Sequence, residues 1–269
     1  MKLSCSSPMV PGETLTAQAE ALKEWGYDAI SIFYPADRWC PATRDEVLGL
    51  EDRTGIVPCE FAFSSPLYGH LMDSDLARRQ AARAMYKEAA ALCAELGSAV
   101  TELEFEYGPQ DPLPLFDPYQ ALDEGQREAF TEMYLELLEP VQGTDARVLL
   151  EPINRYESRY LNSVSDCVDA VCAVSNPRAG LLFDFFHVSI EEANIAESIK
   201  QAADLIFHVH LADNNRLLPS MGNIDWPACI EVLCSAGYDG VLNLECSTSG
   251  DPAVTLPATA AYLRTLIGS

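Results

Sequence analysis

Four residues that can bind a metal ion stand at the ends of four short apolar runs in the C-terminal half of the chain. The runs are RVLLE, ending at Glu151, GLLFD, ending at Asp184, LIFHVH, ending at His210, and VLNLE, ending at Glu245. Each gap between successive ends has room for about one helix, one strand and their loops. Four ligands at matching points of four strand–helix units therefore predict one metal site at one end of a repeating fold.

The chemistry of this set favours a hard divalent cation. Two glutamates, one aspartate and one histidine supply mainly oxygen, which suits Mn²⁺ best, with Mg²⁺ or Co²⁺ as alternatives, rather than a structural Zn²⁺ site. In the alternative interpretation, the acids are solvated at strand ends and His210 is a hydrogen-bonded core residue. Collecting buried carboxylates in one place without a cation is costly, so the metal site is favoured.

The elements that must position these residues alternate along the whole chain. Strands are predicted at 2–6, 28–33, 56–63, 99–105, 146–151, 180–184, 205–211 and 240–245. Helices are predicted at 13–25, 43–54, 74–96, 119–140, 163–175, 190–203, 225–236 and 253–267. Strict alternation with short connections predicts a single α/β domain over 1–269, a closed (β/α)₈ TIM barrel. An open doubly wound sheet would be expected to carry a glycine-rich phosphate turn after its first strand, and SSPMVPGET is not one.

Side-chain alternation predicts which way the ligands point. In LIFHVHL, His208 and His210 share one parity, and the other parity is wholly apolar, so both histidines should face the barrel interior. The same test turns Glu151, Asp184 and Glu245 inward. All four ligands are therefore expected at the C-terminal mouth, where barrel enzymes carry out their chemistry, with His208 one layer deeper.

Polar residues just beyond these strand ends are candidates for substrate contacts, because loops past strand ends supply such contacts. Glu157 follows Glu151 in NRYE, His187 lies three residues after Asp184, and Arg216 closes the run DNNR after His210. In the N-terminal half, His70 in YGHL and Glu106 at the end of a glutamate-rich fourth strand are further candidates for the rim of the mouth.

Composition excludes several other functions. A net charge of −24 disfavours nucleic acid and membrane surfaces as partners. Nine cysteines without a C-x-x-C pair indicate free thiols and a reducing, cytoplasmic protein. We find neither the apolar h-region of a signal peptide nor an apolar stretch long enough to span a membrane.

Four segments carry a resemblance to a known family. EPINRYESRYLN (151–162), FDFFHVSIEE (183–192), FHVHLADNNR (207–216) and LNLEC (242–246) resemble the xylose isomerase-like barrels, in particular the sugar isomerases and epimerases that include D-tagatose and D-allulose 3-epimerases. The resemblance covers essentially the whole chain. YGHL, the glutamate-rich fourth strand, and Ser220 at a position often held by glycine depart from it.

The resemblance implies a role for each residue of the predicted site. One divalent metal, commonly manganese, would be bound by Glu151, Asp184, His210 and Glu245. The two glutamates would also act as the catalytic acid and base. The carbonyl end of the sugar would be held by Glu157, His187 and Arg216. Relatives of this kind commonly form homodimers or homotetramers.

The predicted function is ketose 3-epimerisation. One glutamate would remove the proton next to the ketone, a metal-stabilised cis-enediolate would form, and the other glutamate would return the proton to the opposite face. Alternatives on the same site are a related keto-sugar or keto-acid isomerase, epimerase or dehydratase of inositol or keto-gluconate metabolism, a carbohydrate lyase, and a sugar-binding barrel without turnover. An abasic-site endonuclease would need a histidine-rich zinc cluster and a basic face, which four histidines and a charge of −24 do not favour.

Overall fold

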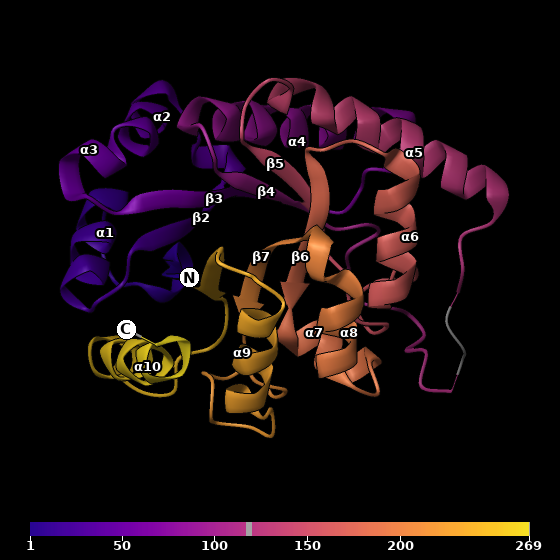
Figure 1. The fold of residues 1–269 in the computed structure, drawn as a ribbon. Helices are drawn as coiled ribbons and strands as arrows, with labels where there is room; N and C mark the ends of the chain where they lie inside the picture. The colour runs from indigo at the N-terminus through magenta and orange to yellow at the C-terminus, as the bar shows by residue number, and fades with distance from the viewer. Residues whose placement is uncertain (117–119, 269) are drawn as a thin grey trace.

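Eight parallel strands close into a barrel in the order of the chain (Figure 1). The computed structural model describes residues 1–116 and 120–268. The strands are β1 (Lys2–Ser6), β2 (Ala29–Pro35), β3 (Val57–Ser64), β4 (Val100–Leu103), β5 (Arg147–Leu150), β6 (Ala179–Asp184), β7 (Ile206–Leu211) and β8 (Val241–Leu244). Pairing of β1 with β8 closes the barrel, so the predicted TIM barrel is confirmed.

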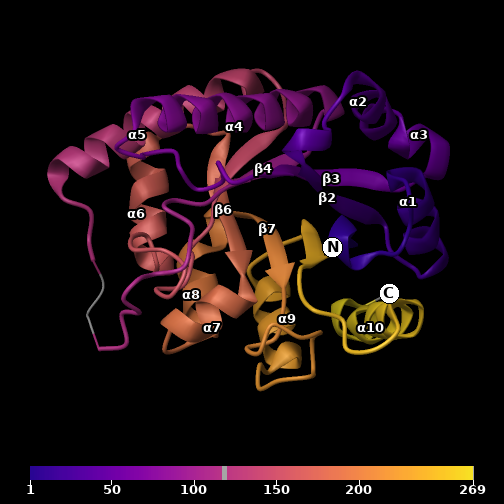
Figure 2. The ribbon, with the colours of Figure 1, turned by 180° about the vertical axis from the view of Figure 1, so that it is seen from behind.

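Helices cover the outside of the barrel, as the two opposite views in Figures 1 and 2 show. They are α1 (Leu15–Glu24), α2 (Pro41–Leu48), α3 (Leu50–Thr54), α4 (Leu76–Leu96), α5 (Glu124–Leu138), α6 (Val164–Val174), α7 (Phe185–Glu191), α8 (Ile195–Ala202), α9 (Trp226–Ser235) and α10 (Pro252–Ile267). The last helix, α10, contacts the segment just before β2. The Tyr27 hydroxyl donates to the carbonyl of Leu256 at 2.9 Å, and Arg264 pairs with Asp28 at 2.6 Å.

Several observed elements differ from the predicted ones. The predicted helix 43–54 is interrupted at Gly49 and forms α2 and α3. The predicted helix 119–140 begins at Glu124, because Asp123 and Gln126 form a reciprocal capping box there; residue 119 lies outside the described residues. The short helix α7 was not predicted; it starts directly after β6, with the Asp184 side chain accepting from the amide of Phe186.

The barrel interior is layered. Leu149 and Leu182 lie two residues before predicted ligands and pack with Val100 and Phe207 in an apolar cluster separate from the main core. Since side chains two apart on a strand face the same way, this cluster forms a floor below the ligands. The larger core fills the space between the strands and the surrounding helices. The polar ligands therefore lie directly above an apolar floor, inside strands whose outer face packs against the helices.

Candidate metal centre and active site

The four predicted ligands meet at the C-terminal ends of β5 to β8. Asp184, His210 and Glu245 each bring one ligand atom within 4.8 Å of the other two. Glu151 forms a second group of this kind with Asp184 and His187, and a third with Glu102 and His210. Three carboxylates and one imidazole from the ends of four successive strands thus lie in overlapping groups that share Asp184 and His210.

Two buried atoms of this set have no hydrogen-bond partner among the described residues, namely Oε1 of Glu151 and Nδ1 of His210. Burial also raises the pKa of the Glu151 carboxyl well above its usual range, and Glu104 and Glu102 add to that shift. A divalent cation would satisfy both atoms and offset the burial of the carboxylates. The residues present therefore fit an oxygen-rich metal site.

A carboxylate that the sequence did not predict, that of Glu60, contacts the second ring nitrogen of His210. Nε2 of His210 lies 3.0 Å from Oε2 of Glu60, which also lies 3.4 Å from Nε2 of His208 and accepts from the Ser31 hydroxyl. Burial opposes ionisation of Glu60, but the two histidines hold its pKa below the ordinary value. A carboxylate on the second nitrogen of a histidine fixes its tautomer and leaves the first nitrogen for a metal, here Nδ1.

Arg216 joins two of the carboxylates. Its Nη1 donates to Oδ2 of Asp184 at 2.8 Å, and its Nη2 donates to Oε2 of Glu245. Burial raises the pKa of Asp184, yet Arg216 and His187 hold it below the ordinary value. The guanidinium thus balances charge beside the predicted metal ligands.

The loop that carries Arg216 is organised by Asp213. The Asp213 carboxylate accepts from the backbone amide of Ser220 at 3.0 Å and from the indole of Trp226 at 2.9 Å. A side chain on Gly222 would place its Cβ 2.2 Å from this carboxylate, so only glycine fits there. Ser220 has a φ of 76°, a left-handed conformation that glycine adopts more readily, which agrees with the glycine expected at that position.

His187 and Glu157 are linked through one asparagine. Both the backbone amide of Asn154, at 3.2 Å, and its side-chain nitrogen, at 2.7 Å, approach Nδ1 of His187. The Asn154 side chain also donates to Glu157 at 2.9 Å. Since the backbone amide can only donate, Nδ1 accepts and Nε2 carries the proton. That nitrogen lies 3.8 Å from Asp184 and 4.0 Å from Glu151.

A cavity of about 640 Å³ opens at the mouth of the barrel. From the predicted site it reaches Arg216 and Glu245, and on the opposite side it reaches Tyr68, Glu102 and Glu104. Its other lining residues come from the C-terminal ends of β1, β2 and β3 and from the segments after β1, β3, β4 and β8: Ser6, Pro8, Met9, Phe33, Pro35, Phe63, Ser64, Ser65, Tyr107, Cys246 and Ser247. This space is wide enough for a sugar.

His70 and Glu106 lie outside the residues that line this cavity. The ring of His70 pairs with Asp73 at 3.0 Å. The strand predicted to run to residue 105 ends at Leu103, and Glu106 has a φ of 52°, so the inward alternation stops before it. Their contact with a substrate therefore remains a prediction, whereas the earlier glutamates of the same segment do face the cavity.

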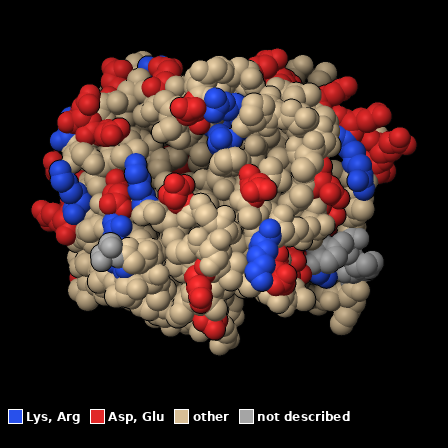
Figure 3. Space-filling view, viewed as in Figure 1, with Lys and Arg blue, Asp and Glu red and all other residues tan. Residues whose placement is uncertain are grey.

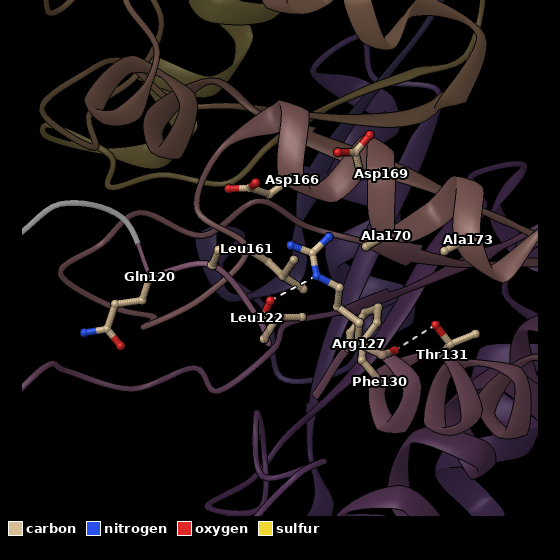
Figure 4. Close-up of a pocket in the computed structure, with 11 residues that line it drawn as sticks. Gln120, Leu122, Arg127, Phe130, Thr131, Leu161, Asp166, Asp169, Ala170 and Ala173 are labelled. Carbon is tan, nitrogen blue, oxygen red and sulfur yellow. Dashed lines mark hydrogen bonds between the residues drawn. The ribbon is translucent and has the colours of Figure 1, made fainter. Parts of the chain in front are cut away.

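A second, smaller cavity of about 90 Å³ lies between α5 and α6 on the outside of the barrel (Figure 4). Arg127 points into it and donates through Nε to the carbonyl of Leu122 at 3.0 Å, with Asp166 and Asp169 on the facing helix. None of the predicted ligands or substrate contacts lines it. This cavity is therefore separate from the predicted site at the mouth of the barrel.

The sequence as a whole matches one protein family. Residues 19–266 match the xylose isomerase-like TIM barrel family. The chain belongs to this family. Within the xylose isomerase-like barrels, it is 32% identical over 154 residues to 3-dehydro-D-guloside 4-epimerase of Escherichia coli, a match covering 57% of this chain and 58% of that protein. It is 28% identical over 250 residues to L-ribulose 3-epimerase of Mesorhizobium japonicum, covering 91% of this chain and 79% of that protein.

Solved structures extend the likeness over the full barrel. The apo crystal structure of a 3-keto-D-glucoside 4-epimerase from Escherichia coli aligns with a TM-score of 0.86 at 26% identity, covering 98% of this chain and 99% of that one. The sequence matches are shorter. For the first curated relatives they span 58%, 40% and 44% of the relative, about half its length.

The surface is strongly acidic. Figure 3 shows aspartate and glutamate spread over the face drawn, with fewer lysines and arginines among them. Within the described residues, every helix is too short or too polar to traverse a lipid bilayer.

Proposed function

We propose that this protein is a divalent-metal-dependent epimerase that inverts the carbon next to the ketone of a sugar, with ketose 3-epimerisation as the lead reaction. The observation that carries the proposal is the placement of its two glutamates. Glu151 and Glu245 each form a close group with Asp184, and no group of the described residues contains both. Two carboxylates on either side of the Asp184–His210 pair suit removal of a proton from one face of a carbon and its return to the other.

The residues around the glutamates have complementary tasks. Glu245 reaches the cavity with 24% of its side chain exposed, whereas Glu151 is buried and lacks a partner for one oxygen. Arg216 and the Nε2–H of His187 would hold the oxygens of the substrate at its keto end, with Glu157 supporting them through Asn154. Mn²⁺, or else Mg²⁺ or Co²⁺, would supply stabilisation of the negative charge that develops beside the ketone.

The test is exchange of substrate hydrogen with solvent. Protein loaded with Mn²⁺ and incubated with D-psicose, D-tagatose or L-ribulose in D₂O should place deuterium on C3 of at least one sugar, as followed by NMR. Glu245→Gln should keep the fold and reduce this exchange by at least about 10³-fold, as removal of an acid–base group does. Unchanged exchange in that variant would contradict the role of Glu245.

A second candidate reaction is epimerisation at C4 of a 3-keto-glycoside. The mouth cavity shares Pro8, Met9, Cys246 and Ser247 with a neighbouring hollow of about 500 Å³. That hollow has no charged lining residue and could take the aglycone of a glycoside. The likeness to the Escherichia coli 4-epimerase points the same way. Methyl 3-keto-D-glucoside in the same D₂O assay, with deuterium sought at C4, separates the two reactions.

We also propose a reducing, cytoplasmic setting and self-association as a homodimer or homotetramer. All nine cysteines are free, which supports the first. Exposed Leu113, Leu115 and Phe116 on the segment after β4 support contacts with a second copy. Light scattering that returns a monomer mass at micromolar concentration would contradict self-association.

A further inference from the structure

Three side chains on the N-terminal side of the mouth have no part in the proposed chemistry. Tyr68 follows β3, Glu102 belongs to β4, and Glu104 follows directly after it. All three line the mouth cavity, as do Glu245 and Arg216. The three form what we term the Tyr68 cluster.

Packing and one hydrogen bond fix the place of Tyr68 in this cluster. The Tyr68 hydroxyl donates to Oε1 of Glu102. Its ring stacks on Tyr86 at 5.3 Å between centroids and meets Tyr107 edge-on at 6.0 Å. The next residue is Gly69, where a Cβ would lie 2.6 Å from the backbone nitrogen of Tyr107, so the two loops touch at this point. The Tyr68 hydroxyl and the Glu102 carboxyl are therefore presented at defined positions.

Two oxygens of the Tyr68 cluster lack partners. Glu102 and Glu104 are only 1% and 8% exposed, and Oε2 of each has no hydrogen bond within the described part of the chain. A buried polar atom without a partner is costly, so each of these oxygens favours a hydrogen-bond donor. Because both glutamates line a cavity large enough for a sugar, hydroxyl groups of a bound molecule could meet this requirement.

The position of the Tyr68 cluster indicates which part of a substrate would reach it. Glu102 lies in a close group with Glu151 and His210, so the cluster borders the metal ligands. The keto end of a sugar would lie at the metal ligands, Arg216 and His187. The remaining hydroxyls would then extend over Glu102 and Glu104.

The charges around the cavity discriminate between sugars. Arg216 is the only basic residue among those that line it, and its guanidinium is already paired with Asp184 and Glu245. A divalent ion and Arg216 together balance the three carboxylates of the ligand set, and no lining cation remains for Glu102 and Glu104. A phosphate or carboxylate on the substrate would therefore meet further acids and find no unpaired lining cation.

We infer that Tyr68, Glu102 and Glu104 form a hydroxyl-binding subsite for the part of an uncharged keto-sugar remote from its reacting carbon, and that this subsite excludes phosphorylated and acidic sugars. The inference rests on the proposed function for the orientation of the sugar. It assigns substrate selection to side chains that are separate from the acid–base pair.

The experiment compares Tyr68→Phe and Glu104→Gln with the wild-type Mn²⁺-loaded enzyme. On the best keto-sugar of the D₂O panel, each variant should raise KM about tenfold, as loss of one hydrogen bond of about 1.4 kcal/mol does, and change kcat less than about threefold. A deoxy analogue lacking the remote hydroxyl should have a higher KM than its parent for wild-type enzyme and nearly the same KM for the variants. Tyr34→Phe and Glu132→Gln, outside the cavity lining, serve as matched controls and should behave as wild type.

Binding measured by calorimetry separates this inference from the proposed function. Wild-type protein should bind D-fructose at least about tenfold more tightly than D-fructose 6-phosphate, whether or not either sugar is turned over. Equal binding of the two, or a fall in kcat at constant KM in either folded variant, would overturn the inference. Absence of exchange with every keto-sugar would instead contradict the proposed function. Circular dichroism confirms that each variant is folded, and either variant alone decides the question.

Discussion

The acidic side chains on the two sides of the barrel mouth differ in their hydrogen-bond partners. On the side of β6 to β8, Arg216 donates to both acids, Asp184 and Glu245, and Asn154 holds the nearby His187. On the side of β4 and β5, Glu102, Glu104 and Glu151 each keep one buried oxygen without a partner in the described residues. The difference indicates that one side is prearranged for a fixed reaction, while the other side is completed by what it binds.

Removal of a shared metal ligand should have the largest effect on the side of β6 to β8. Asp184→Asn takes one negative charge from the ligand set and leaves Arg216 with a single carboxylate. We expect Mn²⁺ affinity to fall at least about 100-fold, since ligand charge dominates binding of hard cations. Calorimetric titration of the metal-free protein measures this. Asp169→Asn on the exposed face of α6 is the control, and an unchanged affinity in Asp184→Asn would remove that residue from the ligand set.

Glu60→Gln tests whether the two sides are separate in function. Glu60 belongs to β3 but contacts His210 of β7 at 3.0 Å, so its substitution should weaken metal binding. Loss of such a supporting carboxylate costs about 10- to 100-fold in metal affinity. The ratio of affinities for D-fructose and its 6-phosphate should stay constant at saturating Mn²⁺, whereas Glu104→Gln should change that ratio and leave metal affinity intact. If both variants altered the same quantity, the division between the two sides would be wrong.

Gly222→Ala disturbs only the support of Arg216. The added methyl group would collide with the Asp213 carboxylate at 2.2 Å. We expect a loss of about 1–3 kcal/mol in unfolding free energy, the usual cost of overpacking, together with a raised KM. Gly125→Ala on α5 has no contact closer than 3.5 Å and should be slightly stabilising. Urea denaturation of both variants measures the difference, and equal stabilities would contradict the packing argument.

The smallest effect is a pH dependence of the metal-free protein. Burial, reinforced by neighbouring acids, raises the pKa values of Glu102, Glu104 and Glu151 well above the usual range. An acid with a raised folded pKa stabilises the fold below its unfolded pKa, about 4.3 for glutamate, and this contribution is lost as pH rises through the folded value. The thermal midpoint should therefore fall by a few degrees between about pH 5 and pH 8. Saturating Mn²⁺ should reduce this slope, and a midpoint that rises over that range would contradict the assignment.

Local patterns predicted the barrel and brought the ligand set together because those features depend on period and spacing. Apolar runs ended in Glu151, Asp184, His210 and Glu245, and alternation turned them inward. Glu60 was missed because it sits inside the apolar run IVPCEFAF, and its partner His210 is 150 residues away in the chain. Tyr68 was missed for a similar reason, since its role depends on how the loop after β3 packs on the segment after β4.

The hydrogen bond from Trp226 to Asp213 gives the molecule an internal optical reporter. The indole is fully buried and donates to the carboxylate that shapes the loop of Arg216. Any rearrangement of that arginine on binding a cation or a sugar would change the polarity around the ring. The emission wavelength and quenching of this tryptophan would then follow events at the mouth of the barrel, and Trp226→Phe would identify its share of the signal beside Trp25 and Trp39.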